Sequence, residues 1–507
     1  MRRVLTAILV AGALAALIAW SCWQRWRLVS VSPFPLGVDG YFYPIELRAV
    51  LAHGGLAYPA SPLAFYLLAP FAAATDPITG AKLGAVVLGA LIAVPAYGVG
   101  ARLGGGRGAG LLAATLATTS VGSAYLTIEF VKNGIGLTVG LTALWLALRA
   151  AERPTRGRIA AALGGLIAAY ATHKMAAAVV LGVALPAGLA AAADHGRLRG
   201  RRLIYAAGGA AGLVIAVLAL GVAAPHRVLS LEDAGLVRGL FSATPRWAAP
   251  TLARADGDLA LGHDAVLGLG FALAAIAARM WQTRRIARRP AEAPAIRPSS
   301  AITAAGMAIL VLAIAIGLPF LAVDDPQGLG FRLRLAAFVP CALAAAILAR
   351  AIQLPQRDAA LAALCLVLAI VRQPGDRLDG EIVTHPALVS AAQALDGHVP
   401  PGATLIVPER HIAFMVAWYT GAEVALQPDA VPPDRRYRLL PLHFIGEGSA
   451  LDHALLAARA QPGLIAPLGV HPRHPNGLVL VAEPTWLWVL AQLPATDRAY
   501  FAAWPTI

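Results

Sequence analysis

Two acidic residues attract attention because each occupies a short polar stretch between apolar runs. Asp39 lies in GVDGYFYP (residues 37–44), and Glu129 lies in IEFVKNG (residues 128–134). A carboxylate held at a membrane surface can take the proton from an attacking hydroxyl group and so act as a general base. The simpler interpretation of Asp39 is a turn or helix-capping residue between glycines, and composition alone favours it. The surrounding elements must therefore decide the role of both acids.

Basic and amide side chains occupy similar places. They are Lys132, Asn133, His173, Lys174, Arg332 and Arg334. Lysine and arginine bind phosphate, and they stabilise the negative charge that grows on a leaving phosphate group. Each residue also has an ordinary explanation: a solvated turn at Asn133, a surface histidine, or arginines that anchor a helix at the interface. Their significance depends on whether the fold brings them to one face of a membrane.

The composition indicates an integral membrane protein. Of the 507 residues, 58% are hydrophobic and only 13% are charged, whereas a soluble domain is about half apolar and a quarter charged. The net charge of +14 raises the alternative of nucleic-acid binding. The basic residues cluster in short segments between apolar runs, however, and membrane topology already explains that pattern. No nucleic-acid partner is expected.

About eleven apolar runs have the length of a membrane span, at roughly 18–20 residues per helix. They are residues 4–20, 82–101, 108–126, 134–150, 159–172, 175–193, 203–223, 261–279, 301–322, 335–352 and 358–372. The stretch from 159 to 193 is too long for one helix and carries His173 at its middle, so we expect a hairpin there. The first run lacks a clean cleavage site, which favours a retained span over a signal peptide.

The arginines orient these spans. They gather in alternate connections, near residues 2–3, 102–107, 149–158, 197–202, 279–297 and 350–357. The positive-inside rule puts those connections and the N-terminus in the cytoplasm. An odd number of spans then puts residues from about 373 to the end outside, together with 21–81, 127–133, 173–174, 224–260 and 323–334. All the acids and bases named above therefore belong to the outer face.

The outer face also carries its own short elements. Residues 41–54 and 61–74 are too short or too mixed to span and suit helices lying in the interface. In the tail, 385–395 reads as an amphipathic helix and 403–409, 463–470 and 477–483 as strands. We therefore expect an α-helical polytopic membrane domain over residues 1–372, with a first external loop at 21–81, and a small extracytoplasmic α/β domain over 373–507.

Several other classes of protein lack support. No P-loop, nucleotide-binding GxGxxG or nucleophile elbow occurs. Ionisable residues are almost absent from the middle of the spans, which counts against a proton- or ion-coupled transporter. Cys22, Cys341 and Cys365 have no metal-ligand spacing, and the HPRHP stretch (471–475) reads as a proline-rich loop more readily than as a metal site. No cofactor is identified by these residues.

The order of the motifs resembles the GT-C superfamily of polyprenyl-phosphate-dependent glycosyltransferases. This superfamily includes protein O-mannosyltransferases, the aminoarabinose transferase of lipid A and the catalytic subunit of oligosaccharyltransferases. GVDGYFYPIELRAVLAHGGL resembles their first external loop, in which an acid followed by an aromatic-rich interfacial helix is the catalytic carboxylate. Asp39 takes that place here, followed by Tyr41 and Tyr43. IEFVKNGIGL resembles their second acidic motif, with Glu129 at the acid.

Two further motifs carry the resemblance. His173 in YATHKM is similar to a histidine at the corresponding hairpin tip of relatives, and FRLRLAAFVP resembles a segment whose arginine contacts the donor phosphate. Arg332 and Arg334 both fit that arginine. The chain lacks the WWDYG-type signature of oligosaccharyltransferases, and Glu129 has no neighbouring acid. A metal-independent transfer of a monosaccharide is therefore the better match, and a divalent cation is not favoured.

The resemblance implies an inverting glycosyltransferase of the bacterial inner membrane, active on the periplasmic side. Asp39 would be the general base and Glu129 a positioning or secondary acid. Arg332 or Arg334, with Lys132 or Lys174, would bind the phosphate of a polyprenyl-phosphate-linked sugar in the lipid bilayer. The alternative is a non-catalytic binder or flippase of lipid-linked glycans on the same scaffold. A polymerase or ligase would need a large external loop between late spans, and neither the donor sugar nor the acceptor is named by any motif.

Overall fold

Contacts between residues divide the chain into two units. The computed structural model describes residues 2–194, 239–246, 255–288, 299–324, 328–352, 356–372, 386–407, 410–425, 431–441, 445, 448–465 and 477–502. The first unit, here the membrane unit, comprises residues 1–31 and 54–381. The second, here the α/β unit, comprises residues 32–53 and 382–507. The segment that carries Asp39 thus groups with the C-terminal part of the chain.

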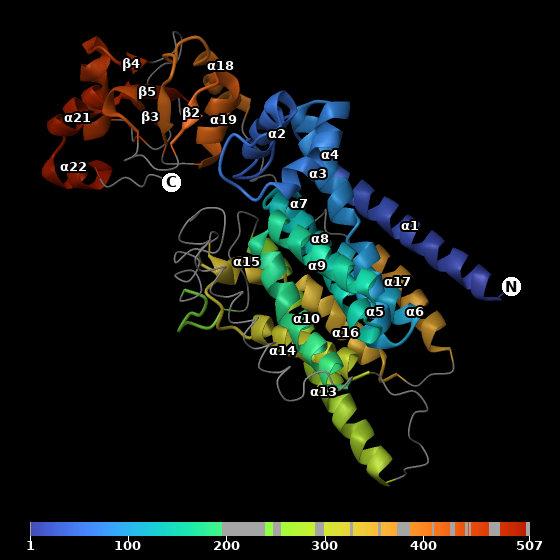
Figure 1. Cartoon of the computed structure of the whole chain (residues 1–507). Helices are drawn as coiled ribbons and strands as arrows, with labels where there is room; N and C mark the ends of the chain where they lie inside the picture. The colour runs from blue at the N-terminus through green and yellow to red at the C-terminus, as the bar shows by residue number, and fades with distance from the viewer. Residues whose placement is uncertain are drawn as a thin grey trace, which may run out of the picture. The chain divides into compact units, whose positions relative to one another are not determined.

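The membrane unit is built of helices (Figure 1). They are α1 (Arg2–Val29), α3 (Leu63–Ala74), α4 (Pro77–Ala90), α5 (Ala93–Gly104), α6 (Arg107–Thr118), α7 (Val121–Ile128), α8 (Val131–Glu152), α9 (Arg156–Thr172), α10 (Lys174–Asp194), α13 (Ala255–Arg288), α14 (Ser300–Gly317), α15 (Leu329–Leu335), α16 (Phe338–Ala349) and α17 (Arg357–Val371). The predicted polytopic helical class is confirmed. The predicted interfacial segment at 61–74 forms α3, and the predicted hairpin separates α9 from α10 at His173.

Six helical segments of the described chain are long and apolar enough to cross a membrane, and two bent pairs raise the number to eight. The sequence predicts about eleven spans. Three predicted spans remain. Two of them correspond to α9 and α17, which have 17 and 15 residues and are shorter than the 18 residues expected of a span. The third, at 203–223, lies outside the described residues. The predicted first span, at 4–20, is longer than expected, because α1 continues as one helix to Val29.

Two of the spans are bent, which the apolar runs do not reveal. The α6–α7 pair turns by 47° and the α15–α16 pair by 45°. At the first bend the hydroxyl groups of Thr118 and Thr119 donate to carbonyls one turn earlier in α6, a back-bonding pattern that bends helices. Ser120 then caps α7, because its Oγ accepts a hydrogen bond from the Ser123 amide. Each bend gives a short helix, α7 or α15, a direction different from that of the longer helix in its pair.

Buried polar groups hold α7 from two sides. Arg25 of α1 is 1% exposed, and its guanidinium donates to the Ser123 carbonyl at 2.9 Å, to the Ser123 hydroxyl at 2.8 Å and to Thr127 Oγ1 at 3.0 Å. On another side, Ser120 Oγ donates to Asp264 of α13 at 2.5 Å. Arg372, which follows α17, pairs with the same Asp264 carboxylate at 2.5 Å. Because buried polar groups need such partners, these bonds fix where α7 lies.

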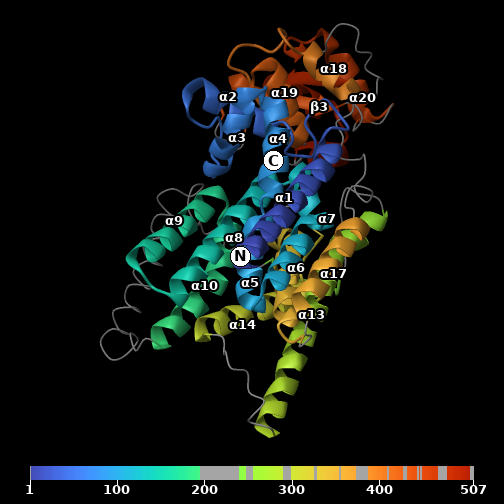
Figure 2. The same ribbon diagram turned by 90° about the vertical axis from the view of Figure 1, so that its right-hand side faces the viewer.

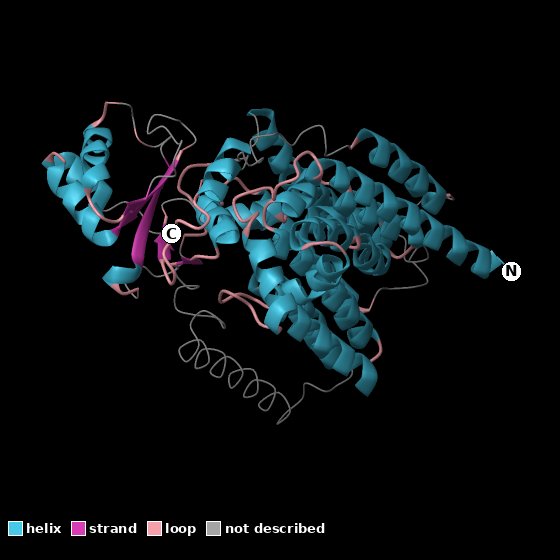
Figure 3. Ribbon diagram, turned by 90° about the horizontal axis from the view of Figure 1, so that it is seen from above, coloured by secondary structure: helices cyan, strands magenta, loops and turns pink. Residues whose placement is uncertain are grey.

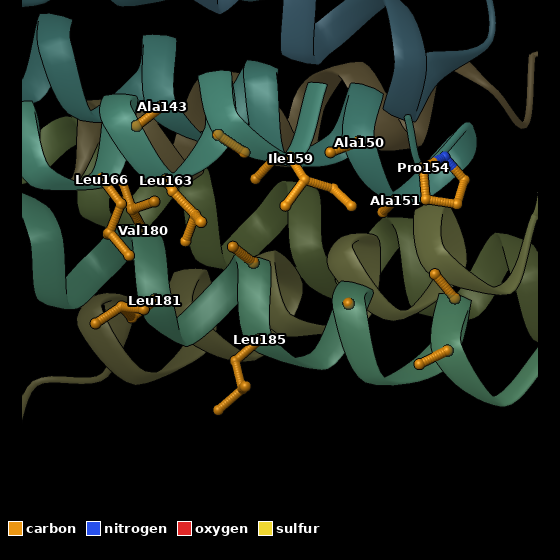
Figure 4. Close-up of a pocket in the computed structure, with 16 residues that line it drawn as sticks. Ala143, Ala150, Ala151, Pro154, Ile159, Leu163, Leu166, Val180, Leu181 and Leu185 are labelled. Carbon is orange, nitrogen blue, oxygen red and sulfur yellow. The ribbon is translucent and has the colours of Figure 1, made fainter. Parts of the chain in front are cut away.

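Helices α8, α9 and α10 lie side by side (Figures 1 and 2). They line an open apolar pocket of about 320 Å³, near the ends of α9 and α10 that lie away from His173 (Figure 4). The pocket is lined by alanine, valine, leucine, isoleucine, proline and glycine side chains, among them Leu163, Val180 and Leu185. No lining side chain carries a group that could do acid–base chemistry, so this pocket is not the candidate active site.

The α/β unit contains a five-stranded mixed sheet (Figure 3). Its strands are β1 (Thr404–Ile406), β2 (Glu423–Val424), β3 (Arg436–Pro441), β4 (Leu464–Ile465) and β5 (Leu478–Ala482), and its helices are α2 (Phe42–His53), α18 (Pro386–Ala394), α19 (Arg410–Thr420), α20 (Ala450–Ala457), α21 (Glu483–Gln492) and α22 (Ala495–Ala502). The strand order is β2-β1-β3-β5-β4, with β1 parallel to both neighbours and the other pairs antiparallel.

Helices cover both faces of this sheet. Helices α20 and α21 pack with Leu440, Val479 and Val481 on one face, while α18 and α19 pack against β5 and β1. Leu439 and Leu480, which alternate with the first set, are also fully buried. A sheet buried on both faces needs apolar residues at successive positions, as the runs at 403–409 and 477–483 supply. The expected small α/β domain is confirmed.

Candidate active site

Asp39 lies in a tight turn that two glycines make possible. Gly37 has a φ of +78°, a conformation that glycine adopts at little cost. A Cβ at Gly40 would lie 2.5 Å from the Leu36 carbonyl oxygen, so no larger residue fits. The Asp39 carbonyl accepts a hydrogen bond from the Phe42 amide at 3.1 Å, directly before α2. The turn therefore fixes the backbone of Asp39 relative to the first residue of α2, and the Asp39 side chain is partly exposed.

The aromatic residues after Asp39 are buried in the α/β unit. Tyr41 and Tyr43 are 2% and 3% exposed. The Tyr41 hydroxyl shares a hydrogen bond of 3.2 Å with Tyr419 of α19, and the Phe42 ring lies 5.0 Å from the ring of Phe414. Burial, followed by the hydrogen bond to Tyr419, raises the pKa of Tyr41. Tyr41 is therefore a neutral packing and hydrogen-bonding group.

Glu129 lies at the sharp junction of α7 and α8. It is 3% exposed, and its amide donates to the Tyr125 carbonyl as α7 ends. Helix α8 starts at Val131 and continues through Asn133, so the alternative of a solvated bend at this asparagine is not what the structure has. Asn133 is 4% exposed, and its Nδ2 has no hydrogen-bond partner in the described part of the chain. A buried amide donor of this kind is rare unless a ligand or water uses it.

His173 is held at the tip of the α9–α10 hairpin. Its Nδ1 accepts a hydrogen bond from the Met175 amide at 3.3 Å, so a neutral imidazole carries its proton on Nε2. Burial, and then the positive charges of Lys132, Arg332 and Lys174, lower the pKa of His173 to about 3. The ring is therefore uncharged at neutral pH.

The same electrostatic effect identifies a cluster of cations, here the cationic cluster: Lys132, Lys174 and Arg332. Aromatic rings support two of its members, with Lys132 Nζ 5.8 Å from the centre of the Phe65 ring and Arg332 Cζ 5.5 Å from that of Phe130. Lys132 lies in the first turn of α8, and Lys174 is the first residue of α10. Helix N-termini carry partial positive charge and free amides, so they add to the attraction for an anion.

Lysine is rare in this chain, so composition alone does not explain two lysines at one place. Of the 41 lysines and arginines, three are lysines: Lys82, Lys132 and Lys174. Two of the three belong to the cationic cluster. An ammonium group is a compact point charge that can move on its flexible stem, whereas guanidinium is a planar fork. The cluster thus combines two point charges with one fork, a set that suits a phosphate group.

The structure separates the two arginines that sequence reasoning left equivalent. Arg334 is fully buried, and its Nη2 donates to the Leu318 carbonyl at 2.9 Å, at the C-terminal end of α14. It thereby satisfies a carbonyl that the helix itself leaves unbonded. Arg332 is partly exposed and lies close enough to His173 to affect its pKa. Arg332 belongs to the cationic cluster, and Arg334 holds the end of a helix.

Sequence reasoning missed the residues that support the site. Arg25 was hidden because the predicted first span ended at residue 20, and the pairing of Asp264 with Arg372 joins residues far apart in the chain. A signal existed for the first bend in the run Thr118-Thr119-Ser120, since hydroxyl residues back-bond and cap helices. In the described parts of the chain, no three histidine, cysteine, aspartate or glutamate side chains gather as metal ligands would.

The candidate residues therefore fall into two groups. The membrane unit brings together Glu129, Asn133, His173 and the cationic cluster, around the junctions of α7 with α8 and of α9 with α10. The α/β unit carries Asp39, Tyr41 and Tyr43. Chemically, the first group suits the binding of a phosphate-like anion, and the second offers a carboxylate in a defined turn.

Comparison with solved structures identifies the fold. The chain is similar to ArnT from Cupriavidus metallidurans in the apo state, with 14% identity over 96% of this chain and 99% of that chain and a TM-score of 0.51. The structure of ArnT bound to undecaprenyl phosphate gives 15% identity, 93% and 98% coverage and a TM-score of 0.52. An oligosaccharyltransferase from Archaeoglobus fulgidus, in complex with Zn and sulfate, has 14% identity over 81% of this chain and 62% of that chain, with a TM-score of 0.47.

A scan of protein families and a search of curated proteins found no match to this sequence. The structural likeness extends over nearly the whole chain. ArnT is an aminoarabinose transferase of the GT-C superfamily, so the chain has the GT-C fold, and the predicted resemblance is confirmed at the level of the fold.

Proposed function

We propose that this chain, which has the GT-C fold, is a glycosyltransferase that takes its sugar from a polyprenyl-phosphate-linked donor at the periplasmic face of the bacterial inner membrane. The observation that carries the proposal is the packing of the α9–α10 hairpin tip on α8, where His173 meets Gly136. Lys132 in the first turn of α8 and Lys174 at the start of α10 flank this contact. Their charges act on His173 together with that of Arg332. Two helix N-termini add to the positive potential of this cationic cluster. The ArnT structure with undecaprenyl phosphate supports the choice of anion.

The reaction is a single displacement. An acceptor hydroxyl oxygen attacks the anomeric carbon, the bond from that carbon to the phosphate oxygen breaks, and the polyprenyl phosphate leaves with the electron pair. The hydroxyl proton passes to the carboxylate of Asp39, the general base. Because the attack comes from the face opposite the leaving group, the anomeric configuration inverts. Glu129 positions the reacting groups, and Tyr41 and Tyr43 hold the segment that carries Asp39.

The cationic cluster stabilises the departing phosphate. Its charges oppose the negative charge that grows on the phosphate oxygens as the glycosidic bond breaks. His173 is neutral and carries its proton on Nε2, so it adds a hydrogen-bond donor without further repulsion among the cations. The Nδ2 of Asn133 supplies another buried hydrogen-bond donor, which can bind the lipid-linked sugar. Arg334 has no direct part in this step, because its guanidinium is used by the end of α14.

The first experiment tests the base. Purified protein in nanodiscs is incubated with radiolabelled polyprenyl-phosphate sugars and detergent-extracted membranes as the acceptor source. We expect transfer by the wild type and none by Asp39→Asn, while thermal stability stays the same. Full transfer by Asp39→Asn would remove Asp39 from the mechanism. An unchanged donor pool with movement of donor across vesicle membranes would instead favour the alternative of a flippase.

The second experiment uses the scarcity of lysine. Reductive methylation with ¹³C keeps the charge of the three lysines and gives each an NMR signal, which Lys→Arg variants assign. Undecaprenyl phosphate is expected to shift the signals of Lys132 and Lys174, with Lys82 of α4 as the internal reference. Undecaprenol, which has the same chain without phosphate, is the matched control. Equal shifts with both lipids, or none at Lys132 and Lys174, would contradict the phosphate site.

The proposed orientation is tested separately. Single cysteines at Gly157, in the first turn of α9, and at His53, the last residue of α2, are labelled in intact cells with a thiol reagent that cannot cross the inner membrane. Only position 53 should react, because the proposal places the first position in the cytoplasm and the second outside. The reverse pattern would overturn the periplasmic site.

A further inference from the structure

Helix α2 is bound to helix α19 by contacts along its first turns. The hydroxyl groups of Tyr41 and Tyr419 lie 3.2 Å apart, with the ring centroids 5.8 Å apart in an edge-on arrangement. The guanidinium of Arg48 lies 4.4 Å from the centre of the Trp418 ring, and its Nη1 donates to the Trp418 carbonyl at 3.2 Å. Together with the Phe42–Phe414 contact, these interactions join the segment of residues 32–53 to the C-terminal domain.

The other side of this contact is firmly anchored. Helix α19 follows β1 after a short connection, and its residues Ile412, Phe414, Met415 and Val416 are fully buried. A helix buried to this degree is part of the core and resists displacement. Trp418 and Tyr419, in its last turn, are only partly buried and contact Arg48 of α2 and Tyr41. The C-terminal domain therefore provides a rigid support for α2.

A displacement of α2 must move Asp39. The carbonyl of Asp39 accepts from the Phe42 amide, and the turn between them is constrained at Gly37 and Gly40. Only Gly40 and Tyr41 separate the acid from the helix, and both belong to the same turn. A catalytic group displaced by about 1 Å can lose on the order of a hundredfold in rate. Whatever holds α2 in place thus controls the geometry of the acid.

We propose that Trp418 and Tyr419 of α19 are positioning residues for Asp39, so that the C-terminal α/β domain sets the place of the catalytic carboxylate. This inference rests on the proposed role of Asp39 as the base. The two residues act through α2 and do not touch the reacting groups. The C-terminal domain is then part of the catalytic machinery and not an accessory that only selects acceptors.

The kinetic experiment uses full-length variants. Trp418→Ala removes the surface on which Arg48 stacks, and Tyr419→Phe removes one hydroxyl. We expect kcat to fall roughly 10- to 100-fold in Trp418→Ala, with unchanged affinity for undecaprenyl phosphate, because the cationic cluster belongs to the other unit. Trp418→Phe keeps a ring for Arg48 and should recover most of the rate. Leu487→Ala, an exposed change in α21 of the same domain, is the matched control.

A double-mutant cycle tests the tyrosine pair. Tyr41→Phe and Tyr419→Phe each remove the same hydrogen bond, so the double variant should lose no more activity than either single variant. Additive losses would show that the two hydroxyl groups act independently and would overturn this part of the inference. Wild-type kcat in both Trp418→Ala and Tyr419→Phe would overturn the whole of it.

A measurement that needs no sugar transfer keeps the two proposals distinguishable. Hydrogen–deuterium exchange of residues 37–53 should accelerate in Trp418→Ala and stay at the wild-type rate in Leu487→Ala. Unchanged exchange in Trp418→Ala would refute the anchoring directly. If exchange is faster in Trp418→Ala but the wild-type protein itself transfers no sugar, the proposed function is refuted and only the structural contact remains.

Discussion

His173 rests against Gly136 of α8, where a Cβ would come within 2.7 Å of the Cβ of His173. The absence of a side chain at Gly136 is thus what lets the tip of the α9–α10 hairpin approach α8. The same tip carries Lys174, while α8 carries Lys132 in its first turn. Gly136 therefore permits the contact between the two elements that carry these lysines.

The first prediction concerns this contact. In Gly136→Ala the new methyl group meets the base of the His173 side chain, which cannot rotate away, so the hairpin tip must shift. We expect the affinity for undecaprenyl phosphate to fall roughly tenfold. Gly164→Ala in α9, where a Cβ meets nothing within 4 Å, is the control and should keep wild-type affinity. Wild-type affinity in Gly136→Ala would mean that the hairpin tip does not determine the phosphate site.

The second prediction is a dependence of stability on pH. The pKa of His173 falls from 6.5 to about 3 on folding, owing first to burial and then to the neighbouring cations. Between these values the unfolded chain binds a proton at this histidine that the folded chain does not, so stability decreases as the pH falls below 6.5. His173→Gln removes this contribution. Thermal unfolding of the ligand-free protein should lose less between pH 7.5 and pH 5 in His173→Gln than in the wild type, and an equal loss would contradict the assignment.

The third prediction separates Arg332 from Arg334. Arg332→Ala should weaken the binding of undecaprenyl phosphate by roughly 10-fold or more, as expected for a lost charge-assisted hydrogen bond, and leave the melting temperature unchanged. Arg334→Ala should lower the melting temperature, because the Leu318 carbonyl at the end of α14 loses its donor. Arg156→Ala, at an exposed site in α9, is the control for lost charge. The opposite pattern would return the phosphate to Arg334.

The fourth prediction concerns the buried pair of Asp264 and Arg372. Removing one partner leaves a charge buried among apolar helices, so Asp264→Ala should destabilise the protein by about 3–5 kcal/mol. Replacing both, as in Asp264→Leu with Arg372→Met, should restore much of that stability because no charge remains uncompensated. Denaturation in detergent followed by circular dichroism measures both. A double variant less stable than the single one would show that the charged pair itself is required.

The sequence contained most of the architecture. The apolar runs located α8, α10 and α14 to within a few residues, and His173 marked the break between α9 and α10. Glycine and aspartate in GVDG predicted a tight turn. The structure shows that Gly37 has a positive φ and that a side chain at Gly40 would meet the Leu36 carbonyl. These features are local, so composition and periodicity reveal them.

Long-range relations were not readable in the same way. Arg332 and Arg334 are two positions apart in one short helix, α15, so only the packing of α15 against α7, α13 and α14 decides which of them is buried. In the sequence, Arg25 looks like an arginine at the end of a span. Only the structure shows that its guanidinium binds Ser123 and Thr127 of α7. The assignment of residues 32–53 to the C-terminal domain depends on contacts across more than 300 positions, which a single sequence does not display.

The discontinuity of the α/β unit has a consequence for how the protein is made. Residues 32–53 leave the ribosome long before residues 410–420, which supply α19, and at roughly 5–20 residues per second the interval is tens of seconds. Throughout that time the membrane helices are being inserted while α2 lacks its contacts with α19. The segment that carries Asp39 gains its contacts with α19 only after residues 410–420 have been synthesised. Under the proposed function, with Asp39 as the base, the protein therefore stays inactive until every helix between the two segments has been made.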